Sequence, residues 1–338
     1  MAEYKKKEAR DWARAKMRGV ANVIIPSYTN DLRGLNERGI RHDVRREIEL
    51  GYWGTLLVSE TALTVEEYGQ FVTWAVDESR GRLHLIHHAS FNTLDENIQA
   101  VHLAERNGAD LILLSYPPCF YPETGDEIFE YTKAFCEATN LGVMLFPVPL
   151  WGFERIHPAG IPPATIKKIV KEIPNVVCIK AEGGMPAIGG FVECWQNFHD
   201  EVVVTFPIES EALPLAMLVP MQFIGTSNGE YTGGMVPRIL KLIHEGQNER
   251  AMELYWQIHP ARMANHAAFQ SVAGAHFLHR MIWKYQAWLQ GFNGGPLRAP
   301  TMRIHSKQMR ELRQALMASH LEPTTSPDRE FFIGRNPA

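Results

Sequence analysis

Eight short apolar runs, rich in Val, Ile and Leu, recur along this chain of 338 residues. Most of them begin roughly 20 to 35 residues after the previous one, and longer amphipathic segments lie between them. This alternation predicts βα units around a parallel sheet. The runs lie near Val20 to Pro26, Gly54 to Ser59, Leu83 to Ala89, Asp110 to Pro117, Gly142 to Pro149, Val176 to Ala181, Val202 to Pro207 and Gln222 to Ser227.

Eight strands that alternate with helices favour an α/β chain folded as a (β/α)₈ TIM barrel, in which the active site lies at the carboxyl ends of the strands. An open doubly wound sheet is the competing architecture, but Ile25 to Thr29 follows the first strand where a glycine-rich dinucleotide turn would stand. We expect an exposed N-terminal helical extension at 1–18, the barrel at 19–247 and a C-terminal helical region at 248–322. The tail, 323–338, has little periodicity, so we expect it to be poorly ordered or pinned by a neighbour.

Helix starts are marked by a repeated polar pattern. Threonine followed three residues later by glutamate predicts a capping box, in which the two side chains satisfy backbone amides at the helix start. The pattern occurs at Thr64/Glu67, Thr93/Glu96 and Thr124/Glu127. Pro162 and Pro163 are predicted to begin the helix before the sixth strand, where proline's missing donor costs little. Beyond the barrel, a helical stretch is expected near Ala264 to Leu289.

Composition narrows the classes of partner. The chain has 34 Lys and Arg against 38 Asp and Glu, so its net charge of -4 gives no electrostatic case for nucleic acid or an acidic membrane surface. No run of about 18 apolar residues is present that would cross a membrane. Four cysteines without C-x-x-C spacing indicate free thiols and a cytoplasmic location. No cofactor or metal is expected.

Lys180 is the residue on which a chemical interpretation depends. It ends the apolar run Val176 to Ala181, which opens onto Glu182. Burying an ammonium is costly, so a lysine here can lose its proton and attack a carbonyl carbon to form a Schiff base. The alternative is a strand-end lysine that extends into water. Glu182 shares the face of Lys180, and a close ion pair with it would hold the amine charged.

Three segments, in this order, resemble the dihydrodipicolinate synthase and N-acetylneuraminate lyase superfamily of class I aldolases. They are Leu63 to Glu67, Leu113 to Pro118 and Val177 to Gly183, the last being similar to the family's Schiff-base strand. The resemblance covers about Gly19 to His320. It implies a homotetrameric barrel in which Lys180 forms an imine with a 2-oxo acid, usually pyruvate. The family then makes or breaks a carbon–carbon bond, or adds or removes water.

Two departures concern the groups that assist this lysine. Phe146 stands where the family has a proton-relaying tyrosine on strand five, and phenylalanine has no exchangeable proton. After strand two, Ser59, Glu60 and Thr61 replace a longer loop that binds the substrate carboxylate. Ser59 and Thr61 can still donate, whereas Glu60 would repel a carboxylate if it pointed into the site.

A third departure makes the site more aromatic. Leu150 to Phe153 follows Pro149, where synthases that handle a diacid carry an arginine. Trp151 and Phe153 either stack on a hydrophobic or aryl substrate, as in the hydratase-aldolases of aromatic degradation, or pack the inserted loop on the barrel.

Several further residues are candidates for binding. His88, next to His87 at the end of strand three, is a candidate acid or base, and a metal pair there is disfavoured by strand alternation. Tyr116 and Tyr121 could each supply the hydroxyl that Phe146 lacks, or serve in packing. Small polar groups after strand eight, Thr226 and Asn228 among them, are expected to face the substrate.

These residues predict a Schiff-base-forming class I lyase that acts on a small 2-oxo acid and a hydrophobic or aromatic partner. Two alternatives stay open. One is a barrel that binds a small molecule, or acts as a structural subunit, without imine chemistry. The other uses Lys180 as a general base without an imine.

Overall fold

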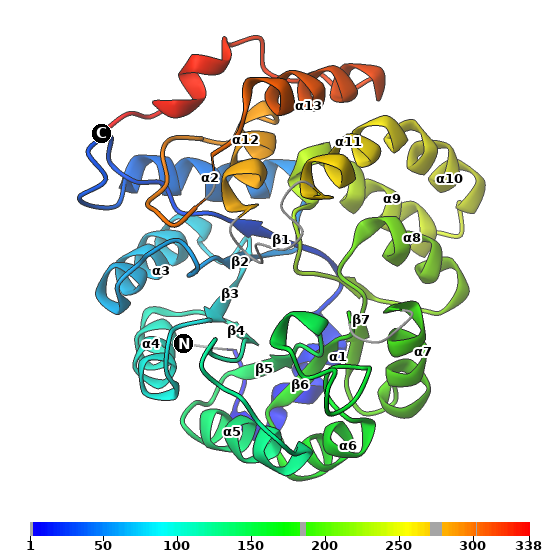
Figure 1. The fold of residues 1–338 in the computed structure, drawn as a ribbon. Coiled ribbons are helices and arrows are strands. Elements are labelled where there is room, and N and C mark those ends of the chain that lie inside the picture. Colours follow the sequence, from blue (N-terminus) through cyan, green and yellow to red (C-terminus); the bar gives the residue numbers. More distant parts are fainter. Residues whose placement is uncertain (1–2, 183–186, 271–278, 302) are drawn as a thin grey trace. The chain divides into compact units, whose positions relative to one another are not determined.

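The computed structural model describes residues 3–182, 187–270, 279–301 and 303–338. Within this part of the chain, eight strands alternate with helices in the order of a (β/α)₈ barrel, and further helices follow the eighth strand (Figure 1). The predicted fold class is therefore confirmed. The strands are β1 (Gly19–Ile24), β2 (Gly54–Leu57), β3 (His84–Ala89), β4 (Leu111–Leu114), β5 (Gly142–Leu145), β6 (Val176–Lys180), β7 (Val203–Thr205) and β8 (Phe223–Ile224).

Each of the eight strands lies within its predicted apolar run, or within one residue of it, so the sequence pattern located all of them. The chain divides into two compact units. Unit 1 contains Met1–Ala21 and His84–Thr226, and unit 2 contains Asn22–Leu83 and Ser227–Ala338. Each unit is described by itself below.

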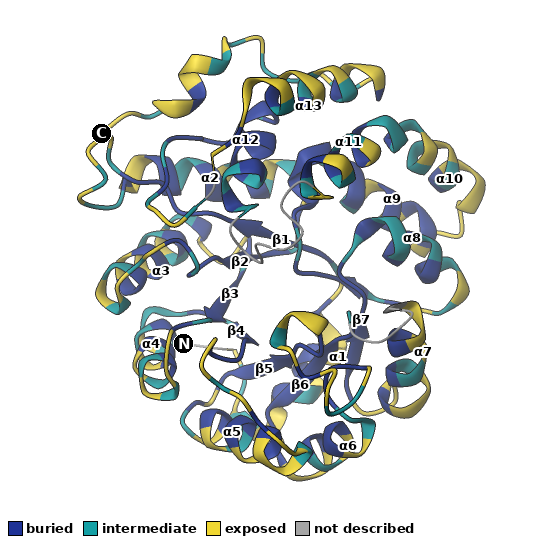
Figure 2. Ribbon diagram, viewed as in Figure 1, coloured by how far each residue is buried: buried dark blue, intermediate teal, exposed yellow. Residues whose placement is uncertain are grey.

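Unit 1 is built on the parallel order β7-β6-β5-β4-β3, and the first residues of β1 pair with β8. Figure 2 shows its strands buried and its helices exposed on their outer faces. Parallel strands covered on both faces read as continuous apolar runs, which is why these strands lack alternation. Its helices are α1 (Ala9–Lys16), α4 (Leu94–Asn107), α5 (Gly125–Glu137), α6 (Pro163–Glu172), α7 (Ala187–Phe198) and α8 (Glu209–Leu218), with the 3₁₀ turns η1 (Lys6–Glu8) and η2 (Pro149–Trp151).

The N-terminal helix α1 is not the fully exposed extension that the sequence suggested. Trp12 and Ala13 are buried. The Arg10 guanidinium donates to the carbonyls of Val176 and Ile173, both at 2.9 Å, at the amino end of β6. One face of α1 therefore packs on unit 1, while Asp11, Arg14 and Lys16 lie on its exposed face.

The helix starts follow the predicted punctuation. Thr64 and Thr124 form complete capping boxes with Glu67 and Glu127. Thr93 caps α4 through its own hydroxyl, but the carboxylate of Glu96 instead accepts from the amide of Asn92 at 2.9 Å. Helix α6 begins at Pro163, as predicted.

Unit 2 combines β2 and the later part of β1 with helices from both ends of the chain. These are α2 (Glu37–Leu50), α3 (Val65–Ser79), α9 (Met235–His244), α10 (Asn248–Gln257), α11 (His259–Gln270), α12 (Arg280–Leu289) and α13 (Ser306–Ala318), with the turns η3 (Gly229–Thr232) and η5 (Asp328–Phe332). The stretch predicted as helical from Ala264 to Leu289 thus contains the end of α11 and all of α12, and 271–278 lies outside the described residues.

The C-terminal tail is held by its own chain. Phe331 is fully buried and meets the ring of Tyr285 edge-on, with centroids 5.2 Å apart. Asn336 binds Asn293, and the carbonyl of Ala338 accepts from the amide of Asn30 at 2.9 Å. The tail has little periodicity because contacts with residues far away in the sequence, rather than local structure, hold it in place.

Truncating Phe331 tests this anchoring. Because its ring is fully buried in a cluster with Tyr285 and Trp288, F331A should lower the free energy of unfolding by roughly 3–5 kcal/mol. The neighbouring Phe332 is 47% exposed, so F332A should cost less than about 1 kcal/mol. Equal effects in urea unfolding would contradict a buried anchor at Phe331.

Candidate active site

Lys180 is the last residue of β6 and is fixed by the strands on both sides. It pairs in register with Thr205 of β7, and beyond it the amide of Glu182 donates to the carbonyl of Pro147 at 3.1 Å. The side chain is only 5% exposed. The strand thus carries a buried amine to the carboxyl end of the sheet, the end at which barrel enzymes place their chemistry.

The neighbour that the structure gives this amine is an aromatic ring. Nζ of Lys180 lies 3.6 Å from the ring centroid of Phe146, which is itself buried. A ring face attracts an ammonium, while burial opposes it, so the two influences act in opposite directions. Phe146 therefore positions the amine but offers no proton to exchange.

Glu182 responds to the same burial. Desolvation raises the pKa of its carboxyl, and the charge of Lys180 opposes that rise. Burial thus disfavours the charged form of Glu182 relative to an exposed glutamate, which weakens the hold that Glu182 would have on an ammonium. Gly183, which follows it in the family-like motif, lies outside the described residues.

Phe146, Trp151, Tyr116 and Phe153 form a connected group of rings in unit 1, here called the aromatic wall. The indole N–H of Trp151 donates to the carbonyl of Phe146 at 2.6 Å, and the two rings meet edge-on at 5.6 Å. Tyr116 lies 6.0 Å from the ring of Trp151 and 5.2 Å from that of Phe153. These contacts show that both inserted aromatic residues pack on their own unit, which leaves open whether they also face a substrate.

The tyrosine hydroxyls are directed elsewhere than toward Lys180. The hydroxyl of Tyr116 lies 2.7 Å from that of Thr132 in α5, which in turn donates to the carbonyl of Ile128. Tyr116 is thus the donor in this pair, and its burial raises its pKa. Tyr121 is 74% exposed beneath the guanidinium of Arg155.

His88, in β3, has a polar neighbour. Its Nε2 lies 3.2 Å from the hydroxyl of Ser115, and both residues are buried. Burial, followed by the proximity of His88, lowers the pKa of His87 to about 3, so His87 is neutral at physiological pH. The described residues hold no group of three or more His, Cys, Asp or Glu side chains suited to a metal ion.

The residues after β8 present polar atoms without protein partners. Thr226, at the end of unit 1, is buried, and its hydroxyl finds no hydrogen-bond partner among the residues that the structure describes. The same holds within the described chain for Nδ2 of Asn228, in unit 2. Such groups are costly to bury, so each is available to a ligand or a water molecule.

The loop after β2, in unit 2, buries Ser59 and Thr61 on either side of Glu60. The hydroxyl of Tyr28 donates to the carbonyl of Thr61 at 2.6 Å. Glu60 forms an ion pair with Arg280, the first residue of α12. The charge that would repel a substrate carboxylate is therefore balanced within unit 2.

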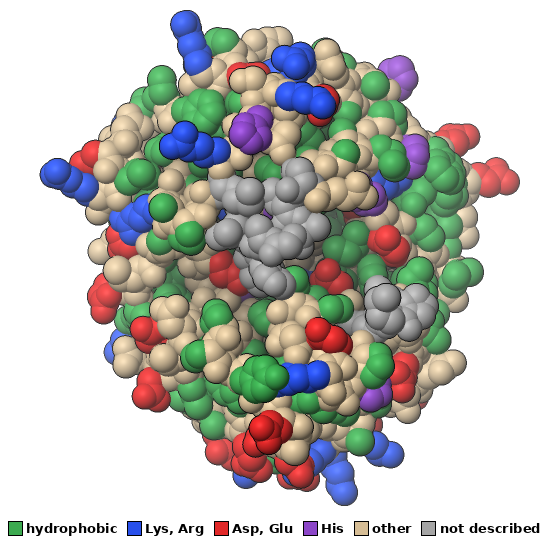
Figure 3. All heavy atoms as spheres, viewed as in Figure 1, with side chains coloured by type: hydrophobic (Ala, Val, Ile, Leu, Met, Phe, Trp, Pro, Cys, Tyr) green, Lys and Arg blue, Asp and Glu red, His purple; other side chains and the backbone are tan. Residues whose placement is uncertain are grey.

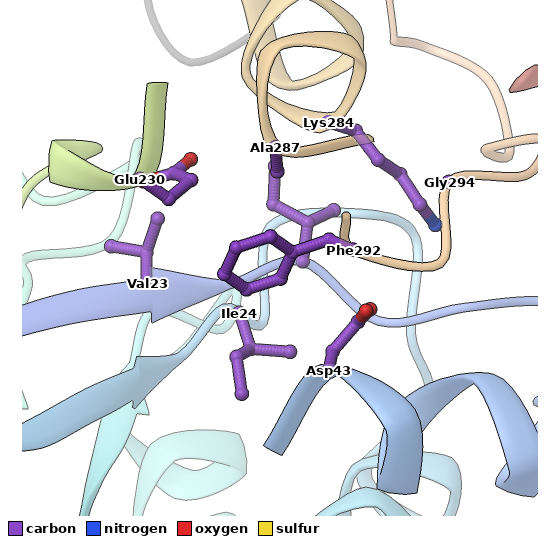
Figure 4. A pocket seen from close by; sticks show the side chains of 9 residues that line it. Val23, Ile24, Asp43, Glu230, Lys284, Ala287, Phe292 and Gly294 are labelled. Carbon is purple, nitrogen blue, oxygen red and sulfur yellow. The ribbon is translucent and has the colours of Figure 1, made fainter. Parts of the chain in front are cut away.

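Sequence reasoning missed the cationic residues of α12. Arg280 and Lys284 are one helical turn apart and both buried. Lys284 donates to the carbonyl of Pro26 at 2.6 Å, and burial lowers its pKa to about 7. Figure 4 shows Lys284 and Asp43 extending toward the same small cavity. Two cations four residues apart in an otherwise apolar segment were the available signal.

Glu230 of η3 borders the same cavity, beside Val23 (Figure 4). It is buried, burial raises its pKa to about 8, and within the described residues its Oε2 has no partner. Because its pKa is about 8, the carboxyl of Glu230 is mostly protonated at neutral pH. The backbone amides of Gly229 and Glu230 both donate to the side chain of Asn22.

The face of the molecule drawn in Figure 3 shows how the charged side chains of the described residues are distributed. On the face drawn in Figure 3, the basic side chains of the described residues are scattered among acidic ones rather than gathered into a basic patch. Among the described residues, no helix combines the length and apolar character needed to span a membrane. All four cysteines are free thiols, as predicted.

The fold and the lysine at the end of its sixth strand define a (β/α)₈ barrel enzyme, and comparison with known proteins specifies which kind. The family model described as "Dihydrodipicolinate synthetase family" matches residues 16–319. The chain belongs to this family and is a lyase of the dihydrodipicolinate synthase type.

Two curated relatives with the same description illustrate the similarity. The 4-hydroxy-tetrahydrodipicolinate synthase of Methanopyrus kandleri is 27% identical over 258 residues, covering 74% of this chain and 81% of the relative. The enzyme of the same name from Bacillus subtilis is 29% identical over 218 residues, covering 62% and 72%. These identities fit a divergent member of the family.

Solved structures share the fold at lower identity. Dihydrodipicolinate synthase from Aquifex aeolicus has a TM-score of 0.75 at 18% identity, covering 91% of this chain and all (100%) of that one. "PhdJ bound to substrate intermediate" has a TM-score of 0.75 at 19% identity, with coverage of 94% and 97%. N-acetylneuraminate lyase from Fusobacterium nucleatum has a TM-score of 0.71 at 15% identity, with coverage of 89% and 98%.

The buried Glu230 gives the protein a pH-dependent stability. Burial raises its pKa to about 8, above the usual value of 4.5 for a glutamate, so the folded state holds the proton more tightly. The contribution is greatest below about pH 4.5 and is lost as the pH rises toward about 8. The free energy of unfolding of wild type should fall relative to E230Q by up to about 4 kcal/mol over this range.

Denaturant unfolding between pH 5 and pH 8 measures this difference. Glu49, whose side chain is 61% exposed, provides the control, and E49Q should track wild type at every pH. A wild-type-minus-E230Q difference that stays constant with pH would show that Glu230 is already ionised.

Proposed function

We propose that this protein is a class I lyase in which Lys180 forms an imine with a small 2-oxo acid. Nζ adds to C2 of the oxo acid and water leaves, so that electrons can later flow from C3 toward the imine nitrogen. The observation that carries the proposal is the buried amine held against Phe146 at the carboxyl end of β6. A structural relative described as YagE in complex with pyruvate, with a TM-score of 0.74, supports the substrate class.

The second substrate, in this proposal, is hydrophobic or aromatic. Phe146 lies against Lys180 and meets the ring of Trp151 edge-on, and Phe153 packs on Tyr116, so this part of unit 1 is rich in aromatic rings. Aromatic side chains bind flat apolar groups through burial and edge-to-face contact. The structure described as PhdJ, at 19% identity, supports the fold of this chain and not the identity of its second substrate.

Protons must be moved without a tyrosine at Phe146. We assign this role to His88 with Ser115, or to water held near the hydroxyl of Thr226, because these are polar groups of unit 1. Within unit 2, Ser59, Thr61 and Asn228 are proposed to bind polar atoms of a small ligand. Their burial supports that role.

The family also supports two statements about the protein's setting. We propose that it is a homo-oligomer, and a tetramer in particular, located in the cytoplasm. The free thiols are consistent with a reducing compartment.

Reduction with borohydride in the presence of pyruvate and other 2-oxo acids tests the imine. The reduced adduct should add the mass of the acid less one oxygen atom to Lys180, because imine formation expels water and reduction adds two hydrogens, and K180R should abolish it. Lys284, a second buried lysine, is the internal control and should remain unmodified in the same digest. An adduct on Lys284 alone, or none with any oxo acid, would contradict the proposal.

A missing adduct together with ligand-induced stabilisation would favour the second candidate function, a barrel that binds small molecules without imine chemistry. The observation in its favour is that Phe146 and Tyr116 place no exchangeable proton at the lysine.

The aromatic wall is tested by truncating Trp151. W151A should raise the KM for an aryl aldehyde by about tenfold, since an indole contact is worth on the order of 1–3 kcal/mol in a pocket, and should leave borohydride trapping of pyruvate intact. The exposed Tyr121 gives the control, and Y121A should change neither quantity. A W151A enzyme with unchanged preference between aryl and aliphatic aldehydes would assign Trp151 to loop packing.

A further inference from the structure

Arg280 and Glu60 form an ion pair that is unusually well shielded from water. Their side chains are 3% and 12% exposed. The guanidinium also lies 4.4 Å from the ring centroid of Trp283, one turn along α12. Removing two charges from water costs about as much as their attraction returns, so such a pair is a weak source of stability. Its presence calls for another explanation.

The location of the pair points to ligand binding. Glu60 follows β2 by three residues and therefore lies at the carboxyl end of a barrel strand, where barrel enzymes bind substrates. The surrounding loop is held in place, because Tyr28 donates to Thr61 and Arg298 donates to the carbonyl of Ala62 at 3.0 Å. The guanidinium is thus presented at a fixed point beside two buried hydroxyl residues, Ser59 and Thr61.

Among the residues that the structure describes, Glu60 is the carboxylate that forms an ion pair with Arg280. Glu230 is near enough for Arg280 to lower its pKa, but burial outweighs this effect and raises the pKa to about 8, so Glu230 is mostly neutral at pH 7. Asp43 interacts with Lys284, which is a turn further along the helix. A carboxylate that replaced Glu60 would therefore restore the same charge balance.

We propose that Arg280 binds the carboxylate of a small anionic ligand within unit 2 and that Glu60 occupies this position until the ligand displaces it. The guanidinium can exchange one carboxylate for another without loss of geometry, because its planar N–H groups match either one. Glu60 then acts as an internal competitor that sets the affinity for anionic ligands.

Lactate and lactamide separate this inference from imine formation. Neither has a carbonyl at C2, so neither can form an imine with Lys180, and they differ in the charge of a single group. Calorimetric titration of the full-length protein should show that E60Q binds lactate at least about threefold more tightly than wild type, whereas R280Q binds it about tenfold or more weakly. Lactamide binding should be unchanged in both variants.

A second ion pair of unit 2 supplies the matched control. Arg298 pairs with Glu67 at the start of α3, and E67Q should leave lactate affinity unaltered. Malate, with a second carboxylate, distinguishes the two sources of the anion: a larger E60Q effect on malate than on lactate would assign Arg280 to a second carboxylate.

The sign of the E60Q effect decides the matter even if R280Q fails to fold. Weaker or equal lactate binding in E60Q would make the pair a structural tie and overturn the inference, as would a wild type that does not bind lactate. Failure of borohydride trapping with the expected lactate pattern would remove the imine and leave Arg280 assigned. The reverse combination would do the opposite.

Discussion

We propose that the position of one buried amine governs the chemistry of this protein. Lys180 ends a strand that pairs with β5 and β7, and the parallel ladder leaves its side chain little freedom to reach bulk water. A lysine that extended from a frayed strand end would be an ordinary surface cation. Here the sheet itself holds the amine in an apolar setting, where the cost of the ammonium form favours nucleophilic behaviour.

The surroundings of the amine distinguish this chain within its family. Phe146 contributes a ring face and Trp151 holds the Phe146 carbonyl through its indole N–H, so the wall near the lysine is apolar. In unit 1, His88 with Ser115 supplies polar groups. The aromatic neighbour of the lysine suits the apolar second substrate that we propose.

Local sequence patterns predicted the fold, but they did not predict contacts between residues far apart in the chain. The apolar runs located every strand, and Thr64, Thr93 and Thr124 begin helices, because strand burial and helix caps are decided within a few residues. The burial of Phe331 against Tyr285 joins the tail to α12, and no local periodicity encodes such a contact. The sequence therefore left the tail as either poorly ordered or pinned by a neighbour, and the structure shows it held by its own chain.

The candidate site shows the same limit. Lys180 could be singled out because its strand and motif are contiguous, whereas the pairing of Glu60 with Arg280 joins residues 220 positions apart. Glu60 alone suggested repulsion of a carboxylate. Its ion pair with Arg280 balances that negative charge within unit 2. The roles assigned to Ser59, Thr61, His88, Tyr116, Trp151, Thr226 and Asn228 stay predictions.

A crystal structure of the protein soaked with a 2-oxo acid tests the central claim most directly. The account predicts continuous density from Nζ of Lys180 to C2 of the acid, with no oxygen remaining on C2. An oxo acid bound with its carbonyl intact, or density joined to Lys284 instead, would contradict it.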